Sequence, residues 1–258
     1  RPAEKIVVLT AADCEILFAI GAGEQVIARG EYCNYPEEAL ALTEVTSGSE
    51  TNIEQIIALE PDLVIMSSMA QTPEQVEALE KAEISVLILD ANTLEGTYAA
   101  IEMIGKVTGK DEQAKTLTEG MQKDLAALAD AVDAESEKTV YFEVSPLEYG
   151  LWTAGKGTFM NELAGLLGIE NAFSDVTGWA EISQEQVIER GPDYIVTIFK
   201  AFEGAMDPVE EILSRPGWED IPAVANQQVK TVDSDEIARP GPRLVNAARD
   251  LYEIFYGN

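Results

Sequence analysis

Two segments of this chain, 131 residues apart, carry the same pattern. Residues 54–65 read EQIIALEPDLVI and residues 185–196 read EQVIERGPDYIV, so that Pro192 follows Pro61 by 131 residues. In each segment a helical stretch ends at a Pro-Asp pair, and a short apolar run follows. A helix, a turn and a buried strand placed similarly in both halves predict two lobes built on the same plan.

Short apolar runs alternate with helical patterns along most of the remaining chain. Asp13 is expected to cap the first helix. Strands are expected over residues 5–10, 26–28, 63–66, 86–89, 139–144, 194–198 and 229–232, and a final helix over about 240–256. Such alternation is typical of βαβ units, whose strands form parallel sheets covered by helices.

The middle of the chain has a different pattern. No strand is expected between residues 94 and 134, and one apolar stripe recurs there at helical spacing: Leu117, Met121, Leu125, Leu128 and Val132. We therefore predict an α/β fold in which two similar open-sheet lobes, residues 1–109 and 137–258, are joined by one long α-helix over residues 110–136. Because ligands of open α/β sheets bind outside the carboxyl ends of the strands, a ligand cleft is expected between the lobes.

The charge balance excludes one class of partner. The 258 residues include 47 acidic and 17 basic side chains, which gives a net charge of −30. A surface so negative repels phosphate backbones and anionic lipid head groups, so we expect no nucleic-acid partner. The chain begins with Arg1 and Pro2 shortly before the first expected strand, which favours a mature chain whose targeting segment has been removed.

Residue types needed for several kinds of catalysis are missing. Histidine is absent, and Cys14 and Cys33 are the only cysteines. No structural zinc site, Ser-His-Asp triad or HExxH metal site can be built from this inventory. We therefore predict a protein that is not an enzyme and holds no protein-bound metal. The two cysteines either form a disulfide or remain buried thiols.

One segment matches the sequence motif of a phosphate-binding loop. Residues 150–158 read GLWTAGKGT, which fits the spacing GxxxxGK. Such a loop needs small residues whose backbone amides wrap the phosphates, whereas Leu151 and Trp152 fill this one. We interpret the segment as the beginning of a helix in the second lobe, with Trp152 near the cleft.

Four stretches of the chain resemble the sequences of one known family. They are residues 10–39 (TAADCEILFAIGAGEQVIARGEYCNYPEEA), 52–65 (NIEQIIALEPDLVI), 152–173 (WTAGKGTFMNELAGLLGIENAF) and 238–253 (ARPGPRLVNAARDLYE). In this order they resemble the helix-linked (class III) substrate-binding proteins of ABC importers for cobalamin, haem and ferric siderophores. The resemblance implies an extracytoplasmic protein, periplasmic or a cell-surface lipoprotein, that delivers a metal chelate to the importer's permease. It also implies a monomer without a cofactor of its own, although the ligand carries cobalt or iron, and membrane contact only through a removed lipid anchor.

Candidate ligand contacts follow the expected strand ends, where open sheets bind their ligands. Aromatic side chains on loops offer flat contact for a macrocycle and lose little entropy on ordering. In relatives the segment before the PGPR turn lines the cleft, which favours Asp235 and Arg239. The candidates are Tyr32 and Met69 in the first lobe, with Asn34, Tyr35, Ser67 and Ser68 beside them, and Tyr149, Trp152, Trp179, Phe199, Lys200, Phe202, Asp235 and Arg239 in the second.

Two acidic residues are candidates for docking to the permease. Glu74 lies at the start of an expected helix in the first lobe, and Glu210 lies near the start of the corresponding helix in the second. The resemblance implies that one exposed carboxylate on each lobe pairs with a basic pocket of the permease. Glu203 is an alternative to Glu210, and a favourable interaction with the helix dipole explains Glu74 almost as well.

The residue inventory ranks the ligands. Haem requires an axial ligand, which without histidine would have to be tyrosine, methionine or cysteine. Catecholate siderophores require clustered basic side chains, and the expected cleft offers only Lys200, Arg239 and Lys156. A corrinoid needs mostly aromatic and polar contacts, so we favour a corrinoid, with a ferric siderophore next and haem third.

Two other classes of function stay open. A chelatase-like enzyme or metal-complex chaperone on the same fold would need a proton-accepting side chain, usually histidine. A surface adhesin would present an exposed apolar patch instead of a ligand-sized cleft.

Overall fold

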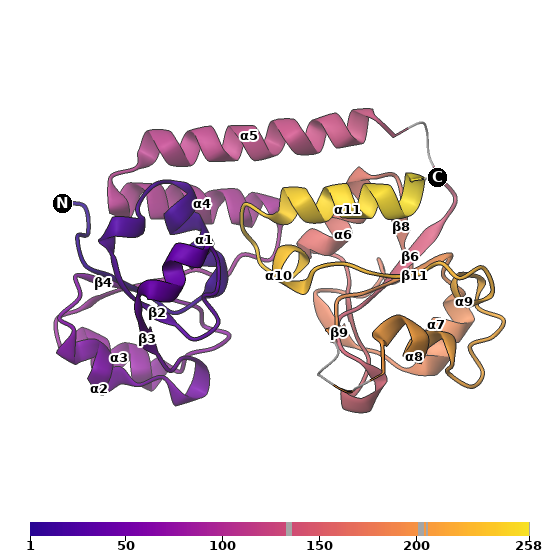
Figure 1. Ribbon diagram of the computed structural model, residues 1–258, viewed down its shortest axis with the longest axis horizontal. Helices are drawn as coiled ribbons and strands as arrows, with labels where there is room; N and C mark the ends of the chain where they lie inside the picture. The colour runs from indigo at the N-terminus through magenta and orange to yellow at the C-terminus, as the bar shows by residue number, and fades with distance from the viewer. Residues whose placement is uncertain (133–135, 201–203, 205, 258) are drawn as a thin grey trace. The chain divides into compact units, whose positions relative to one another are not determined.

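The computed structural model describes residues 1–132, 136–200, 204 and 206–257. The chain forms two compact units, residues 1–122 with 240–242, and residues 123–239 with 243–258 (Figure 1). The change from one unit to the other lies within helix α5 (Asp111–Asp130). The lobe boundaries expected from the sequence, 1–109, 110–136 and 137–258, stay a prediction.

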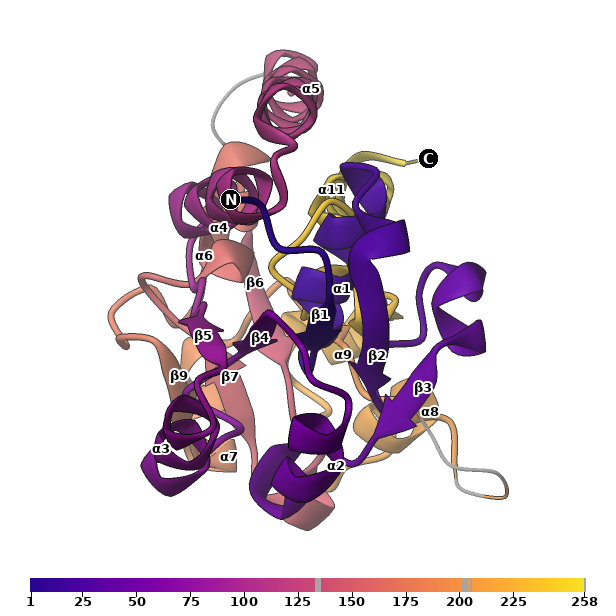
Figure 2. The same ribbon diagram turned by 90° about the vertical axis from the view of Figure 1, so that its left-hand side faces the viewer.

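The first unit contains a parallel five-stranded sheet in the order β3-β2-β1-β4-β5, whose strands lie side by side in Figure 2. Its strands are β1 (Ile6–Val8), β2 (Val26–Gly30), β3 (Thr43–Val45), β4 (Leu63–Met66) and β5 (Ser85–Ile88). The helices between and after them are α1 (Ala11–Ala19), α2 (Ile53–Ala58), α3 (Pro73–Lys81) and α4 (Leu94–Thr108). Every residue of β1 and β4 is buried, as expected for central parallel strands covered on both faces.

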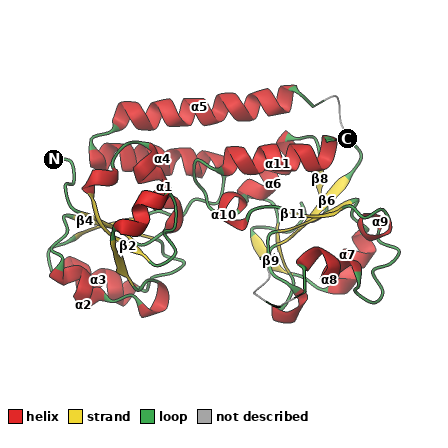
Figure 3. Ribbon diagram, in the orientation of Figure 1, coloured by secondary structure: helices red, strands yellow, loops and turns green. Residues whose placement is uncertain are grey.

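The second unit contains a parallel four-stranded sheet in the order β11-β10-β6-β8 and a separate antiparallel pair, β7-β9. Strands are drawn in yellow in Figure 3. The strands are β6 (Thr139–Glu143), β7 (Trp152–Ala154), β8 (Glu170–Asn171), β9 (Trp179–Glu181), β10 (Tyr194–Thr197) and β11 (Val229–Thr231). The helices are α6 (Phe159–Leu166), α7 (Gln184–Arg190), α8 (Pro208–Leu213), α9 (Pro222–Ala225), α10 (Ser234–Ile237) and α11 (Leu244–Tyr256).

The repeated segment has the same role in both sheets. In the first unit it forms α2 and β4, and in the second it forms α7 and β10. The Asp62 carboxylate accepts a hydrogen bond at 3.0 Å from the amide of Lys5, just before β1, which pairs with β4. The Asp193 carboxylate accepts one at 2.9 Å from the amide of Thr139, which begins β6, the partner of β10. In each unit the aspartate of the Pro-Asp pair therefore links two neighbouring strands. The predicted α/β fold is confirmed.

The start of the first helix was predicted wrongly. Helix α1 begins at Ala11 and its N-cap residue is Thr10, so Asp13 lies in the first turn. Its side chain is buried and accepts a hydrogen bond from the Thr10 hydroxyl. Asp13 is favoured near a helix N-terminus in either position, so local sequence preference alone does not separate the two.

The segment GLWTAGKGT is not a phosphate-binding loop. Its residues 152–154 form β7, which pairs antiparallel with β9, and helix α6 begins only at Phe159. A Cβ atom at Gly155 would lie 2.2 Å from the carbonyl oxygen of Val176, so close backbone contact explains this glycine. Strands β3, β7, β8 and β9 were not predicted, because two or three residues carry too little periodicity.

Helices α4 and α5 occupy the region without strands. Gly109 ends α4 with a φ of 70°, a left-handed conformation that glycine adopts without steric cost. Met121 and Leu125 of the predicted apolar stripe are buried, whereas Val132 follows the end of α5. Among the described residues, no helix combines the length and the apolar character that crossing a bilayer requires.

Candidate functional site

A single carboxylate organises the carboxyl ends of β4 and β5 in the first unit. Asp90 Oδ1 accepts hydrogen bonds from Ser67 Oγ at 2.6 Å and from the Ser68 amide at 3.1 Å. Its Oδ2 accepts one from Ser68 Oγ at 2.5 Å. Partial burial acts to raise the pKa of Asp90, but these hydroxyl and amide donors outweigh it and the pKa is lowered. The carboxylate is therefore ionised at neutral pH.

The pKa of a second carboxylate of the first unit, that of Asp13, is shifted in the opposite direction. Asp13 follows β1 by five residues and its side chain is almost fully buried. Burial raises the pKa of Asp13 to about 7, the hydrogen bond from Thr10 opposes that rise, and the negative charge of Asp90 adds to it. The two aspartates thus differ in protonation because one is desolvated and the other is surrounded by donors.

The first unit presents exposed apolar side chains on the loops after its strands, but no basic ones. Tyr32, after β2, is 67% exposed and Met69, after β4, is 77% exposed. Both were predicted ligand contacts and are accessible. No lysine or arginine occurs in the described segments that directly follow the five strands, residues 9–10, 31–34, 46–47, 67–70 and 89–92. These strand ends therefore provide acceptor groups and apolar contact, with no cation for an anionic ligand.

Two predicted basic contacts of the second unit, Lys200 and Arg239, are ion-paired, whereas Lys156 is exposed. Lys200 Nζ, after β10, lies 3.2 Å from Asp233 Oδ1 and 3.9 Å from Asp235 Oδ2. Arg239 Nη2 lies 3.0 Å from Asp235 Oδ1. Burial acts to raise the pKa of Asp233, but the amide of Asp235 and the Lys200 ammonium outweigh it and the pKa is lowered. The structure thus brings Lys200, Asp235 and Arg239 together as a charge-balanced cluster, and their contact with a ligand stays a prediction.

The aromatic candidates of the second unit lie around the β7-β9 pair and the end of β10. Tyr149 and Trp152 are exposed. Trp179 is half-buried and packs edge-on against Phe159, with ring centroids 5.5 Å apart. Phe199 is half-buried, and its amide donates to Thr197 Oγ1 at 3.3 Å. The remaining aromatic candidate, Phe202, and the alternative docking residue, Glu203, lie outside the described residues.

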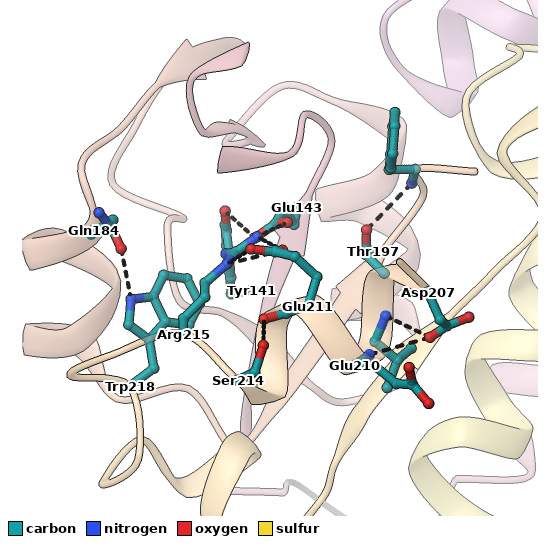
Figure 4. A network of polar contacts seen from close by, with 12 residues as sticks. Tyr141, Glu143, Gln184, Thr197, Asp207, Glu210, Glu211, Ser214, Arg215 and Trp218 are labelled. Carbon is teal, nitrogen blue, oxygen red and sulfur yellow. Dashed lines mark hydrogen bonds and ion pairs between the residues drawn. The ribbon is translucent and has the colours of Figure 1, made fainter. Parts of the chain in front are cut away.

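Sequence reasoning missed a buried ionic network in the second unit (Figure 4). Arg215 donates to Glu143 at 2.7 and 2.8 Å and to Glu211 at 2.5 to 3.1 Å. Tyr141 also donates to Glu143, at 3.3 Å, and the guanidinium carbon of Arg215 lies 4.5 Å from the Trp218 ring centre. Burial raises the pKa of Glu143, and the Arg215 guanidinium opposes that rise. The network joins the carboxyl end of β6 to α8.

Both docking candidates are exposed at helix starts. Glu74 lies in the first turn of α3, whose capping box is formed by Thr72 and Gln75. Its own backbone amide and the Thr72 hydroxyl lower the pKa of Glu74, so it is charged at neutral pH. Glu210 lies in the first turn of α8, where Asp207 Oδ1 accepts from its amide at 3.2 Å. Both side chains are available to a partner surface.

The two cysteines are buried free thiols in the structure. Cys33 Sγ lies 3.7 Å from the carbonyl oxygen of Val8, within the hydrogen-bonding range of a thiol. Of the two readings of these residues, the structure therefore contains the thiol form.

The sequence and the structure are similar to those of substrate-binding proteins. A profile of the periplasmic binding protein family matches residues 6–236. YvrC of Bacillus subtilis, an uncharacterized ABC transporter substrate-binding lipoprotein, is 36% identical over 259 residues, which cover 98% of this chain and 80% of YvrC. The vitamin B12-binding protein of Pectobacterium atrosepticum is 31% identical over 256 residues, covering 96% of this chain and 87% of that protein.

A solved structure agrees over the whole length. A possible iron-binding (periplasmic solute-binding) protein of Staphylococcus epidermidis matches with a TM-score of 0.84 at 30% identity, covering 99% of this chain and 100% of that one.

Proposed function

Because this chain belongs to the periplasmic binding protein family, we propose that it captures a corrinoid and delivers it to the permease of an ABC importer. It is an extracytoplasmic substrate-binding protein of such an importer. One relative binds vitamin B12 and another is described as a possible iron-binding protein. Among these ligands we favour the corrinoid, with a ferric siderophore second and haem third.

The charge balance of the candidate contacts carries this choice. Lys200 and Arg239 are ion-paired with Asp233 and Asp235, and the strand ends of the first unit add Asp90. A catecholate siderophore or a haem propionate would meet few uncompensated cations and several carboxylates, which costs affinity. A corrinoid presents a broad face with neutral amide groups, which aromatic side chains and hydrogen-bond acceptors suit.

A direct comparison of ligands tests the proposal. Purified protein is titrated by calorimetry with cyanocobalamin, haemin and a ferric tris-catecholate. We expect cyanocobalamin to bind at least about tenfold more tightly than either competitor, a difference of about 1.4 kcal/mol. Its affinity should change little between about 0.05 and 0.5 M salt, because no net charge is neutralised on binding. Tighter binding of the tris-catecholate or of haemin would refute the assignment.

The aromatic contacts are tested in the same titration. Replacing Trp152 with alanine should weaken cyanocobalamin binding about tenfold or more, since exposed tryptophans often dominate binding energy. Met103 of α4 is also an exposed apolar side chain, but it lies within a helix and away from the strand ends. M103A is therefore the matched control and should bind as the wild type does.

We assign docking to the permease to Glu74 and Glu210. A lipid anchor would hold the monomeric protein at the membrane, and the protein itself would catalyse no reaction. A chelatase-like enzyme or chaperone is the alternative. It is disfavoured because the chain has no histidine to accept a proton.

Transport measurements test the docking assignment. The double variant E74A/E210A should reduce cyanocobalamin uptake into proteoliposomes or cells about tenfold or more, because one charged contact on each unit is lost. Its ligand affinity should be unchanged. The control E80A/E219A removes two other exposed carboxylates, one from each unit, and so matches the change in net charge. Equal uptake by the two double variants would leave only general charge steering and exclude specific docking.

A further inference from the structure

Asp90 lies at the strand ends of the first unit, and its hydrogen bonds converge on a predicted ligand loop, residues 67–69. Building on the proposed function, we propose that Asp90 is a positioning residue. It holds the turn at residues 67–69 in the conformation that presents Ser68 and Met69 to the ligand.

The strand pairing places Asp90 beside this turn. Strand β4 pairs with β5 in parallel, with Met66 opposite Ile88, so the two chains leave the sheet together. The amide of Leu89 donates to the carbonyl of Met66 at 3.0 Å, which extends the pairing by one more residue. Asp90 follows directly and reaches the turn after β4 without any long loop between them.

One carboxylate holds all three residues of the turn. Ser67 and Ser68 donate to Asp90 through both hydroxyls and one amide, at 2.5 to 3.1 Å. The Ser67 hydroxyl in turn accepts from the amide of Met69 at 3.1 Å. The backbone of the turn thus depends on Asp90 directly and through Ser67, while the Met69 side chain stays exposed to solvent.

The chemistry requires a carboxylate at this position. An ionised carboxylate only accepts, and three donors converge on it here. Asparagine has one acceptor oxygen and an NH₂ group that would face a donor, so D90N loses part of the set with almost no change in shape. The lowered pKa of Asp90 is consistent with a carboxylate that stays charged.

The turn has independent support on its inner side. The amide of Ser67 donates to Gln71 Oε1 at 3.0 Å, and the Gln71 side chain is buried. Asp90 is largely exposed, and its hydrogen bonds go to Ser67 and Ser68 on the outer side of the turn. Its contribution is therefore to the order of the outer turn, which lowers the entropy lost when a ligand binds there.

The matched control lies at the other end of the same strand. Asp62 is exposed, directly precedes β4, and accepts hydrogen bonds from the amides of Glu4 and Lys5 at 2.9 and 3.0 Å. D62N therefore removes a comparable carboxylate from the opposite edge of the same sheet. Wild type, D90N and D62N are compared by cyanocobalamin calorimetry, thermal unfolding and amide hydrogen exchange without ligand.

We expect D90N to bind cyanocobalamin about tenfold more weakly, with D62N unchanged. Amide exchange in peptides covering residues 67–70 should become about tenfold faster in D90N alone. The melting temperatures of the two variants should be similar. A purely structural role for Asp90 would alter melting without this selective change in affinity and exchange.

The outcomes separate this inference from the proposed function. If the wild type binds cyanocobalamin and D90N matches D62N in affinity and exchange, the role of Asp90 is refuted and the proposed function stands. If the wild type binds no cyanocobalamin but exchange at residues 67–70 rises only in D90N, the ligand assignment fails and the positioning of the turn by Asp90 is supported.

Discussion

Replacing Arg215 with leucine is expected to lower the free energy of unfolding of the second unit by about 3–5 kcal/mol. The substitution leaves the Glu143 carboxylate, which is 1% exposed, without its two hydrogen bonds at 2.7 and 2.8 Å. It also removes the guanidinium stacked on Trp218. Denaturant titration followed by tryptophan fluorescence measures the loss.

Two further variants test whether the unfolding free energy lost in R215L comes from the unpaired Glu143 carboxylate. Arg249 pairs with Asp124 at 2.7 Å in the same unit, but both side chains are about half exposed, so R249L should cost at most about 1 kcal/mol. The double variant E143L/R215L should recover much of the loss, because no buried carboxylate at position 143 is then left unpaired. A loss in R215L no larger than in R249L would contradict the assigned role.

The second large effect is a pH dependence caused by Asp13. Its pKa is raised from 3.8 to about 7 in the folded protein, chiefly by burial. Below about pH 4 the carboxyl is protonated in both states. Between about pH 4 and 7 the unfolded chain loses its proton first, so the free energy of unfolding falls as pH rises. Above about pH 7 both states are ionised, and the full destabilisation, about 4 kcal/mol, is reached.

The variant D13N should therefore resemble the wild type near pH 4 and be more stable near pH 8, by up to about 4 kcal/mol. Denaturant titrations at several pH values measure this difference. D62N is a control of opposite sign, because the backbone amides of Glu4 and Lys5 lower the pKa of Asp62, and the stabilisation from this carboxylate is lost as pH falls. A constant difference between D13N and the wild type from pH 4 to 8 would exclude the raised pKa.

Local pattern was sufficient for the main elements of the fold. The repeated Pro-Asp segment predicted an equivalent helix and strand in each half, and these are α2 with β4 and α7 with β10. A buried strand is a run of apolar residues, and a turn such as Pro-Asp marks where the preceding helix ends. Both signals come from residues that are adjacent in the sequence. The short strands β3, β7, β8 and β9 were missed because two or three residues show too little alternation to be recognised.

The candidate site was predicted in part. The chain order placed Tyr32, Met69, Lys200 and Arg239 after strand ends, and the structure leaves Tyr32 and Met69 accessible. Asp90 was not identified. Its importance depends on Ser67 and Ser68, 23 and 22 residues away, which only the parallel pairing of β4 with β5 brings within hydrogen-bonding distance.

The sequence by itself determined the α/β class, the absence of histidine chemistry and the family likeness, because each is a property of residue types and their spacing. Only the tertiary structure decided which charged side chains are paired and which are buried. Lys200 meets Asp233 and Arg215 meets Glu143 across 33 and 72 residues, and Asp13 is buried rather than capping its helix. Burial and long-range pairing set the electrostatic energy of each group, and neither is a local property of the chain.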